Sequence, residues 1–213
     1  MIRKDNLAPR GLKDGAPRKT ATERVFETAR GLFYHRGIRA VGVDEIVQQA
    51  GVTKPSLYRA FGSKDELVAA CLEASRREMG TELDAVVGSV RGDPANQLRA
   101  VMRYFAREIA KPNFRGCTMS NAAIEFPDPG HPGRAILEGC KADLRMRLGE
   151  LARKLEIPDP EGLADGLILI IEGAMASHHI FGSRGPSAAI LATADTLIDA
   201  QRAAIWRDIN AKN

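Results

Sequence analysis

Six polar side chains that can contact nucleic acid lie in one short stretch that begins after Gly51. They are two lysines, an arginine, a tyrosine, a threonine and a serine: Thr53, Lys54, Ser56, Tyr58, Arg59 and Lys64. An arginine can donate two parallel hydrogen bonds to a guanine edge, whereas lysine and hydroxyl groups commonly bind phosphate oxygens. The residue types therefore indicate contacts to duplex DNA, and Arg59 could read a base or bind a phosphate.

The surrounding elements would hold this stretch outward as a short helix. Apolar residues recur at helical spacing just before it: Val43, Ile46, Val47 and Ala50. Gly51 follows them and is suited to end a helix in the left-handed conformation. Thr53 can then cap a second helix that has Pro55 in its first turn. Leu57 and Phe61 face the core, which leaves the polar side chains exposed as on a recognition helix.

Two further helices would support this pair. Residues 20–23 have the capping-box pattern, and an apolar stripe follows them up to Gly37. Residues 63–66 have the same pattern and would start a long helix. Three helices as short as these bury little surface on their own. We therefore expect the small bundle to depend on the long helix that begins at Ser63.

This segment resembles the DNA-binding domain of the TetR family of transcriptional regulators over roughly residues 20–70. The resemblance rests on positions whose spacing holds without a gap: Phe33, Gly37, Val43, Ile46, Ala50, Gly51, Val52, Leu57, Tyr58, Phe61, Lys64 and Leu67. It implies that Thr53 and Lys54 lie near base edges or the adjacent backbone, and that Tyr58 and Lys64 contact phosphate.

Two positions depart from the family pattern. Gly42 stands where a hydroxyl residue that caps the second helix and touches phosphate is usual, and Ala60 stands where a histidine is common. Both departures concern single DNA contacts and leave the domain intact. The predicted DNA-contact residues are Gly42, Thr53, Lys54, Pro55, Ser56, Tyr58, Arg59 and Lys64.

Charge is placed unevenly along the chain. Residues 1–20 hold six basic and two acidic residues and residues 21–64 hold seven and four, so the first 64 residues carry +7 in a chain of net charge +4. Such asymmetry is typical of a protein that binds a polyanion at one end. Because residues 1–20 have almost no apolar side chains, we expect a disordered basic arm that contacts DNA or serves as a solubilising tail.

Composition excludes several protein classes. The 213 residues suit one small and one larger domain, and 44% hydrophobic content with few β-branched runs indicates a soluble helical protein. No apolar run approaches the roughly 18 residues that span a bilayer, and the N-terminus has no apolar signal segment, so we expect a cytoplasmic protein without membrane contact. Cys71, Cys117 and Cys140 are odd in number and lack metal-ligand spacing, so no metal is predicted, and reduced thiols are the default in the cytosol.

Helices are predicted throughout the remainder of the chain. Their expected ranges are 64–88, 94 to just before Pro112, 117–125, 134–156, 160–181 and 187–206. The last two are apolar on more than one face, and a helix of that kind must be buried on all sides. We therefore expect them to pack against their copies in a two-fold homodimer. Its recognition helices would lie about 34–36 Å apart, or at a larger spacing set by the bundle, on a near-palindromic operator.

The family resemblance implies that the larger domain binds a small-molecule effector. Apolar pockets with a few polar groups hold such ligands between helices, and the candidates are Met102, Phe105, Phe114, Cys117, Met119, Asn121, Glu125, Phe126, Glu172, Met175, His178 and His179. Methionine and phenylalanine at helical spacing are more often ordinary core than ligand contacts. Glu172 could meet a cationic or hydroxylated ligand, pair with a basic residue at an interface, or point to solvent. His178 and His179 diverge by about 100°, so a metal site is not predicted.

We therefore predict an all-α protein with a helix-turn-helix DNA-binding domain at residues 21–66 and a helical regulatory and dimerisation domain at 67–213. It would be a regulator, by default a repressor, that a small molecule releases from operator DNA. Motifs such as G-x-S-x-G and H-E-x-x-H are missing, which argues against an enzyme or a cofactor. Two alternatives stay open: a redox-responsive regulator through Cys117 and Cys140, and an architectural DNA binder indifferent to sequence.

Overall fold

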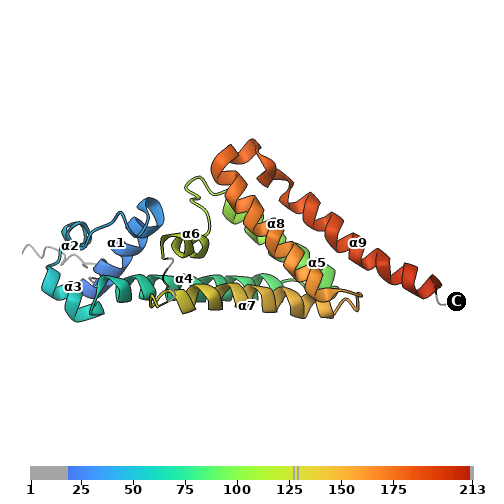
Figure 1. Cartoon of the computed structure of the whole chain (residues 1–213), viewed down its shortest axis with the longest axis horizontal. Coiled ribbons are helices and arrows are strands. Elements are labelled where there is room, and N and C mark those ends of the chain that lie inside the picture. The colour runs from blue at the N-terminus through green and yellow to red at the C-terminus, as the bar shows by residue number, and fades with distance from the viewer. Residues whose placement is uncertain (1–18, 127, 129, 212–213) are drawn as a thin grey trace, which may run out of the picture.

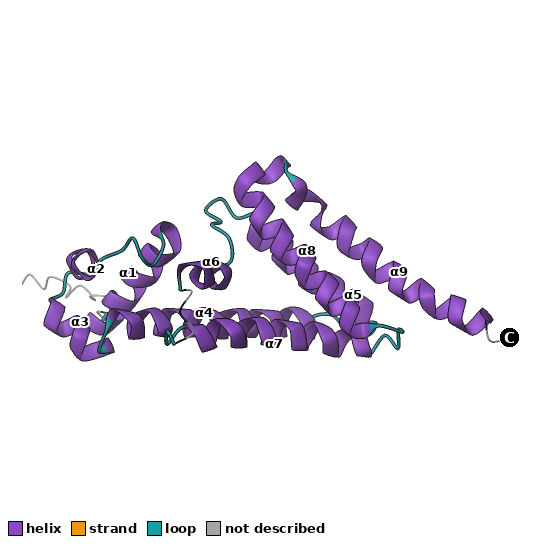
Figure 2. Cartoon of the chain, viewed as in Figure 1, coloured by secondary structure: helices purple, strands orange, loops and turns teal. Residues whose placement is uncertain are grey.

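Helices account for every regular element that the structure describes (Figures 1 and 2). The structure is a computed structural model that describes residues 19–126, 128 and 130–211, so most of the expected basic arm lies outside the described residues. The α-helices are α1 (Ala21–Arg36), α2 (Val43–Ala50), α3 (Lys54–Phe61), α4 (Lys64–Gly88), α5 (Pro94–Ile109), α6 (Thr118–Glu125), α7 (Arg134–Arg153), α8 (Pro160–Phe181) and α9 (Ile190–Ala211).

Local sequence signals set the helix starts. Thr20 and Glu23 form the complete capping box at the start of α1. At the start of α4 only half of the predicted box forms, because Ser63 accepts from the Glu66 N–H at 3.1 Å while its own N–H donates to the Phe61 carbonyl at 2.8 Å. Gly51 adopts the predicted left-handed conformation with φ of 63°.

Three helix boundaries differ from the prediction by three residues or more, and one of them is the end of α9, which extends to Ala211 instead of residue 206. Helix α7 ends at Arg153 instead of residue 156, and Glu156 has a positive φ of 55°. Helix α9 begins at Ile190 instead of residue 187, after two 3-10 turns, η1 (Gly182–Arg184) and η2 (Pro186–Ala189). Hydrogen bonds between residues three apart close both turns, which bring α9 back onto α8 within a short connection.

The helices pack as a small head and a larger body (Figure 1). Helices α1–α3 and the start of α4 form the head, α4 and α7 run side by side, and α5, α8 and α9 form the far end. One apolar cluster fills the head and includes Met119 and Ala122 of α6 with Leu137 and Cys140 of α7. A second cluster joins α5, α7, α8 and α9. Because the head core includes α6 and α7 side chains, a shift of either helix would displace side chains of the head core.

Helix α8 is buried on one side only within the protomer. Its segment Pro160–Arg184 is long and apolar enough, by length and composition alone, to cross a membrane. In this structure α8 packs against α5, α7 and α9. The opposite face presents Leu169, Gly173, Ala176 and Ile180, which are exposed and recur at helical spacing. This uncovered stripe is the apolar surface that a second protein surface would have to cover.

Candidate nucleic-acid interface and effector cleft

Helix α3 presents a polar face to solvent. Leu57 is fully buried and fixes the helix on the head core. Most of the predicted DNA-contact side chains on the other side are exposed: Thr53, Lys54, Pro55, Tyr58 and Arg59. Tyr58 is 46% exposed although it is a large aromatic residue, which is unusual for a side chain without a ligand or partner to contact. The arrangement can place basic and hydroxyl groups in a groove of duplex DNA.

The turn between α2 and α3 is held by Arg24 of α1. Its guanidinium donates to the Ala50 carbonyl at 3.0 Å and to the Gly51 carbonyl at 3.3 Å. These carbonyls end α2 and would otherwise lack a partner in the helix. The sequence analysis missed Arg24, since no spacing rule connects an arginine in one helix to the end of the next. Its position fixes the angle at which α3 leaves the head.

The first turn of α3 carries two local polar contacts. Lys54 forms an ion pair with Asp44 of α2, with 2.7 Å between Nζ and Oδ1, and this pairing raises the pKa of Lys54. The hydroxyls of Thr53 and Ser56 lie 3.0 Å apart. Thr53 is the N-cap residue as expected, but its side chain makes no capping hydrogen bond to the backbone. The hydroxyls of Thr53 and Ser56 and the ammonium of Lys54 therefore lie together at the start of α3.

Lys64 and Gly42 lie at the edge of this face. The Lys64 ammonium donates to the Ile38 carbonyl at 2.7 Å and lies 6.0 Å from the centre of the Phe33 ring. Burial lowers the pKa of Lys64. In this conformation the side chain therefore ties α4 to the loop after α1. Gly42 precedes α2 in an extended conformation without a side-chain cap, and open space surrounds the position of an added Cβ.

A cleft of about 670 Å³ opens between the head and the body, bounded by α1, α4, α5 and α6. Seven of the predicted ligand-binding residues line it: Phe105, Phe114, Cys117, Met119, Asn121, Glu125 and Met175. The sequence analysis missed the wall formed by α1, which contributes Arg30, Phe33 and Tyr34. A ligand in this cleft would therefore touch α1 of the head directly.

Five predicted ligand-binding residues lie outside this cleft. Met102 is buried in the body core, and Phe126 stacks on the ring of His131 with 3.7 Å between centroids. Glu172 accepts from the Ser120 hydroxyl at 2.8 Å and from Lys141. His178 lies 3.2 Å from the Ser187 hydroxyl, and His179 is exposed. Among the described residues no group of three or more histidine, cysteine, aspartate or glutamate side chains could hold a metal ion.

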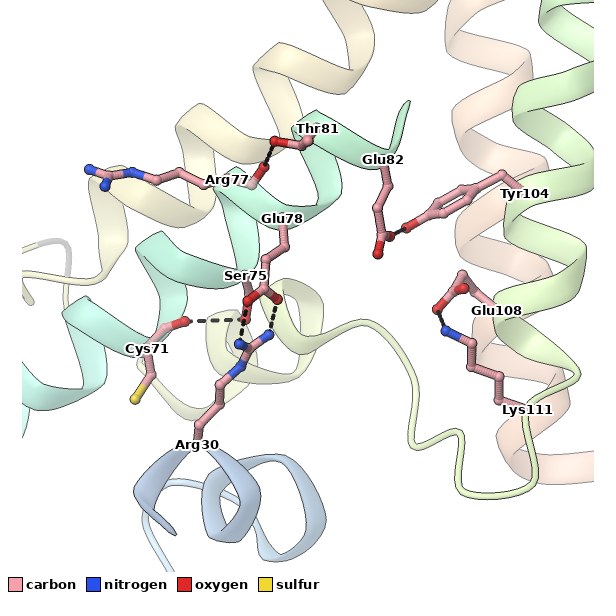
Figure 3. Close-up of polar contacts among 10 residues, drawn as sticks. All are labelled: Arg30, Cys71, Ser75, Arg77, Glu78, Thr81, Glu82, Tyr104, Glu108 and Lys111. Atoms are coloured by element: carbon pink, nitrogen blue, oxygen red, sulfur yellow. Dashed lines mark hydrogen bonds and ion pairs between the residues drawn. The ribbon is translucent and has the colours of Figure 1, made fainter. Parts of the chain in front are cut away.

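Three polar contacts tie the head to the body around the cleft. Arg30 of α1 forms a two-pronged ion pair with Glu78 of α4, which lowers the pKa of Glu78 (Figure 3). The Tyr34 hydroxyl accepts from the Arg115 N–H at 2.8 Å. Glu125, at the end of α6, accepts from the Ile38 N–H at 3.0 Å and the Arg39 N–H at 2.7 Å. Both Glu125 oxygens are thus engaged by the head backbone.

The three cysteines have different surroundings. Cys71 and Cys140 are buried, and burial raises the pKa of Cys71 to about 12 and that of Cys140 to about 11. Cys117 is half-buried, lines the cleft, and accepts from the Lys141 ammonium with 3.3 Å between Nζ and Sγ. Burial would lower the pKa of Lys141, but the nearby Cys117 and Glu172 raise it. Cys117 is therefore the most accessible of the three thiols.

Comparison with solved structures matches nearly the whole fold. A TetR-family transcriptional regulator from Streptomyces coelicolor superposes with a TM-score of 0.81 at 32% identity, over 85% of this chain and 96% of that chain. A TetR-type transcriptional regulator from Streptomyces avermitilis superposes with a TM-score of 0.75 at 30% identity, over 86% of this chain and 98% of that chain.

Comparison by sequence gives the same class of protein. The family profile for bacterial regulatory proteins of the tetR family matches residues 25–71. The transcriptional repressor BdcR of Escherichia coli K12 is 38% identical over 54% of this chain, a match that spans only 58% of BdcR. The transcriptional regulator AcuR of Cereibacter sphaeroides is 29% identical over 78% of this chain and 80% of AcuR.

Proposed function

Because this chain belongs to the TetR family of transcriptional regulators, we propose that it is a cytoplasmic homodimer that leaves a near-palindromic operator when a small molecule enters the cleft. The relatives and neighbours reported above are transcriptional regulators rather than enzymes. The observation that carries the proposal is the exposed polar face of α3, which the fully buried Leu57 holds on the head core.

DNA contact would begin at the start of α3. Thr53, Lys54 and Ser56 would reach base edges or the adjacent backbone, and Tyr58 would reach phosphate. Arg59 is exposed and could bind a guanine edge with two hydrogen bonds. Phosphate contacts would supply most of the non-specific affinity, so binding should fall steeply with salt. In this proposal residues 21–66 form the DNA-binding domain and residues 67–213 form the regulatory and dimerisation domain.

Dimerisation would use α8 and α9. The exposed stripe on α8 runs from Leu169 to Ile180, and Leu191 at the start of α9 is 37% exposed. Small side chains within the stripe, at Gly173 and Ala176, would let a second helix approach closely. A two-fold axis at this surface gives each dimer two copies of α3, which a near-palindromic site requires.

Effector release would act through the wall that α1 forms. A ligand between α1 and α4 would alter the Arg30–Glu78 and Glu125–Ile38 contacts, and so the placement of the head on the body. A coupling free energy of about 1–3 kcal/mol changes operator affinity roughly 5–150-fold. Such a change is enough to switch transcription of the regulated genes.

The proposal is tested by capturing genomic fragments on the purified dimer and measuring affinity for the recovered sequence. We expect a near-palindromic motif bound about 10³-fold or more tightly than random duplex. An architectural DNA binder would give no motif and little preference. Binding to neither kind of duplex would remove the proposed function altogether.

A redox-responsive regulator is the second candidate. Cys117 is half-buried and lines the cleft, so it is the cysteine that an oxidant could reach first. A switch through Cys117 and Cys140 would also need Cys140 to react, and its burial and raised pKa oppose this. These observations favour the small-molecule effector over a disulfide between the two cysteines.

A further inference from the structure

The edge of the cleft carries more acidic than basic side chains. Its lining includes five carboxylates, Glu27, Glu78, Glu82, Glu108 and Glu125, against the cations Arg30 and Lys111 and the neighbouring His35. Three of the five carboxylates have a cationic partner: Glu27 with Lys19, Glu78 with Arg30, and Glu108 with Lys111. A fourth, Glu125, is stabilised by two backbone N–H groups. An uncompensated negative charge is left at Glu82.

Glu82 differs from the other four because it has neither a cationic partner nor a pair of backbone N–H donors. Its Oε2 accepts from the Tyr104 hydroxyl at 2.6 Å, and no cation pairs with it in the part of the chain that the structure describes (Figure 3). Burial and the nearby carboxylate raise the pKa of Tyr104, so the phenol keeps its proton and leaves the charge of Glu82 uncompensated. Figure 3 shows Glu82 and Glu78 leaving α4 on the same side, toward the space between α1 and α5.

Aromatic and sulfur-containing side chains form the walls beside these carboxylates. Tyr104 and Phe105 meet edge to face with 5.1 Å between ring centroids. Phe33 and Phe114 line the cleft from α1 and from the loop before α6, and Met119 and Met175 lie on its apolar lining. Aromatic faces attract cations, and methionine adapts to the shape of apolar ligands.

We propose that the effector is an organic cation with a flat apolar body, whose charged group binds Glu82 and the neighbouring Glu78. The cleft volume of about 670 Å³ lies within the usual range for small-molecule sites. The aromatic walls accept the apolar body, and the excess of carboxylate opposes an anion of the same size. This inference rests on the proposed function, because it names the ligand class of the same cleft.

Binding at Glu78 would also explain how the ligand alters the placement of the DNA-binding head. Glu78 already holds Arg30 of α1 with two hydrogen bonds. A ligand cation that shares Glu78 competes with Arg30 and weakens this tie between α1 and α4.

The test uses the full chain without DNA and two dyes with related ring systems, the cation rhodamine 6G and the anion fluorescein. We expect fluorescence anisotropy to show one saturable rhodamine 6G site per protomer and at least tenfold weaker binding of fluorescein. Glu82→Gln should weaken rhodamine 6G binding about tenfold, as the loss of one charge-assisted contact requires. Glu150→Gln, an equal change of charge on the exposed surface of α7, should leave it unchanged.

Tyr104→Phe should change rhodamine 6G affinity in the opposite direction to Glu82→Gln. It removes the hydroxyl that competes for Glu82 and keeps the ring, so rhodamine 6G should bind roughly threefold more tightly. If the Glu82–Tyr104 hydrogen bond served folding alone, Glu82→Gln and Tyr104→Phe would both bind rhodamine 6G more weakly than wild type. Equal binding of the two dyes, or equal effects of Glu82→Gln and Glu150→Gln, would overturn the inference. If the dye test fails, operator capture with the same protein shows whether the proposed function still holds. Failure to bind any operator would overturn the proposed function together with this inference.

Discussion

Lys54 and Asp44 form an ion pair that the proposed binding of α3 to DNA would break. The ion pair lies on the exposed side of the α2–α3 unit, where its carboxylate would face the phosphate backbone if α3 enters a groove. The free protein gains little from an exposed pair of this kind. The complex would lose affinity through repulsion between Asp44 and phosphate.

Asp44→Asn should therefore raise affinity for operator DNA about two- to fivefold, because it frees Lys54 and removes a negative charge from the interface. The measurement is fluorescence anisotropy with a labelled operator duplex over a series of salt concentrations. Asp84→Asn, which removes an exposed carboxylate from α4, is the matched control. Unchanged or weaker binding by Asp44→Asn would show that α3 does not approach DNA from this side.

The three cysteines should differ in the reactivity of their thiols. Because the pKa values of Cys71 and Cys140 are raised to about 12 and about 11, at most about one thiol in a thousand is ionised at pH 8. We expect iodoacetamide at pH 8 to label Cys117 first, and the other two only as the pH approaches those values or the protein unfolds. Peptide mass spectrometry gives the order. Rapid labelling of Cys140 at pH 8 would restore the case for a Cys117–Cys140 disulfide switch.

Residue roles could be predicted from sequence only where a local rule applies. The outward face of α3 follows from the positions of Leu57 and Phe61 along one helix. The ammonium of Lys64, by contrast, lies on the Ile38 carbonyl, and Arg24 caps α2 from α1. Both contacts join separate helices, so they depend on packing angles that no spacing pattern contains.

Helix α6 connects the cleft to the head. It contributes Met119 and Ala122 to the head core, and its last residue holds the backbone of the loop after α1. Asn121 anchors the preceding loop by donating to the Arg115 carbonyl at 2.8 Å. A displacement of α6 by a ligand would therefore pull directly on the segment between α1 and α2.

Glu125→Ala should loosen that segment. The backbone N–H groups of Ile38 and Arg39 would lose their acceptor, which costs about 1–2 kcal/mol for a charged acceptor that is partly exposed. Amide exchange measured by NMR should be about tenfold faster at both residues. Ile124→Ala, at a neighbouring position that is 81% exposed, should leave both rates unchanged. Equal rates in the two variants would mean that α6 does not hold the head.

Helix positions could be predicted well from sequence, whereas the cleft could not. Proline, glycine and capping residues mark many of the helix ends, so α4 and α8 begin and end where the sequence indicates. The two 3-10 turns before α9 are shaped by the return onto α8, and their type was not predictable. The cleft joins residues from Glu27 to Met175, and its α1 wall depends on how the head sits on the body.

At the scale of the whole molecule, the apolar stripe on α8 should form the dimer interface. Leu169 is 73% exposed in the protomer, and a charge there would be buried without a partner in the dimer. Leu169→Glu should therefore shift the sedimentation mass from dimer to monomer and weaken binding to a two-site operator. Met146→Glu, at a residue on α7 that is 52% exposed, should remain dimeric. A dimeric Leu169→Glu variant would place the interface elsewhere.

The most direct test of the central claim is the ratio of dissociation constants for the captured operator and a scrambled duplex of equal length, measured on wild-type protein and Tyr58→Ala. If the outward face of α3 binds DNA, wild type should prefer the operator by about 10³-fold. Tyr58→Ala should weaken binding to both duplexes alike, because a phosphate contact carries little sequence information. Wild-type affinity in Tyr58→Ala for both duplexes, with the dimer intact, would contradict the assignment of α3 as the DNA-binding face.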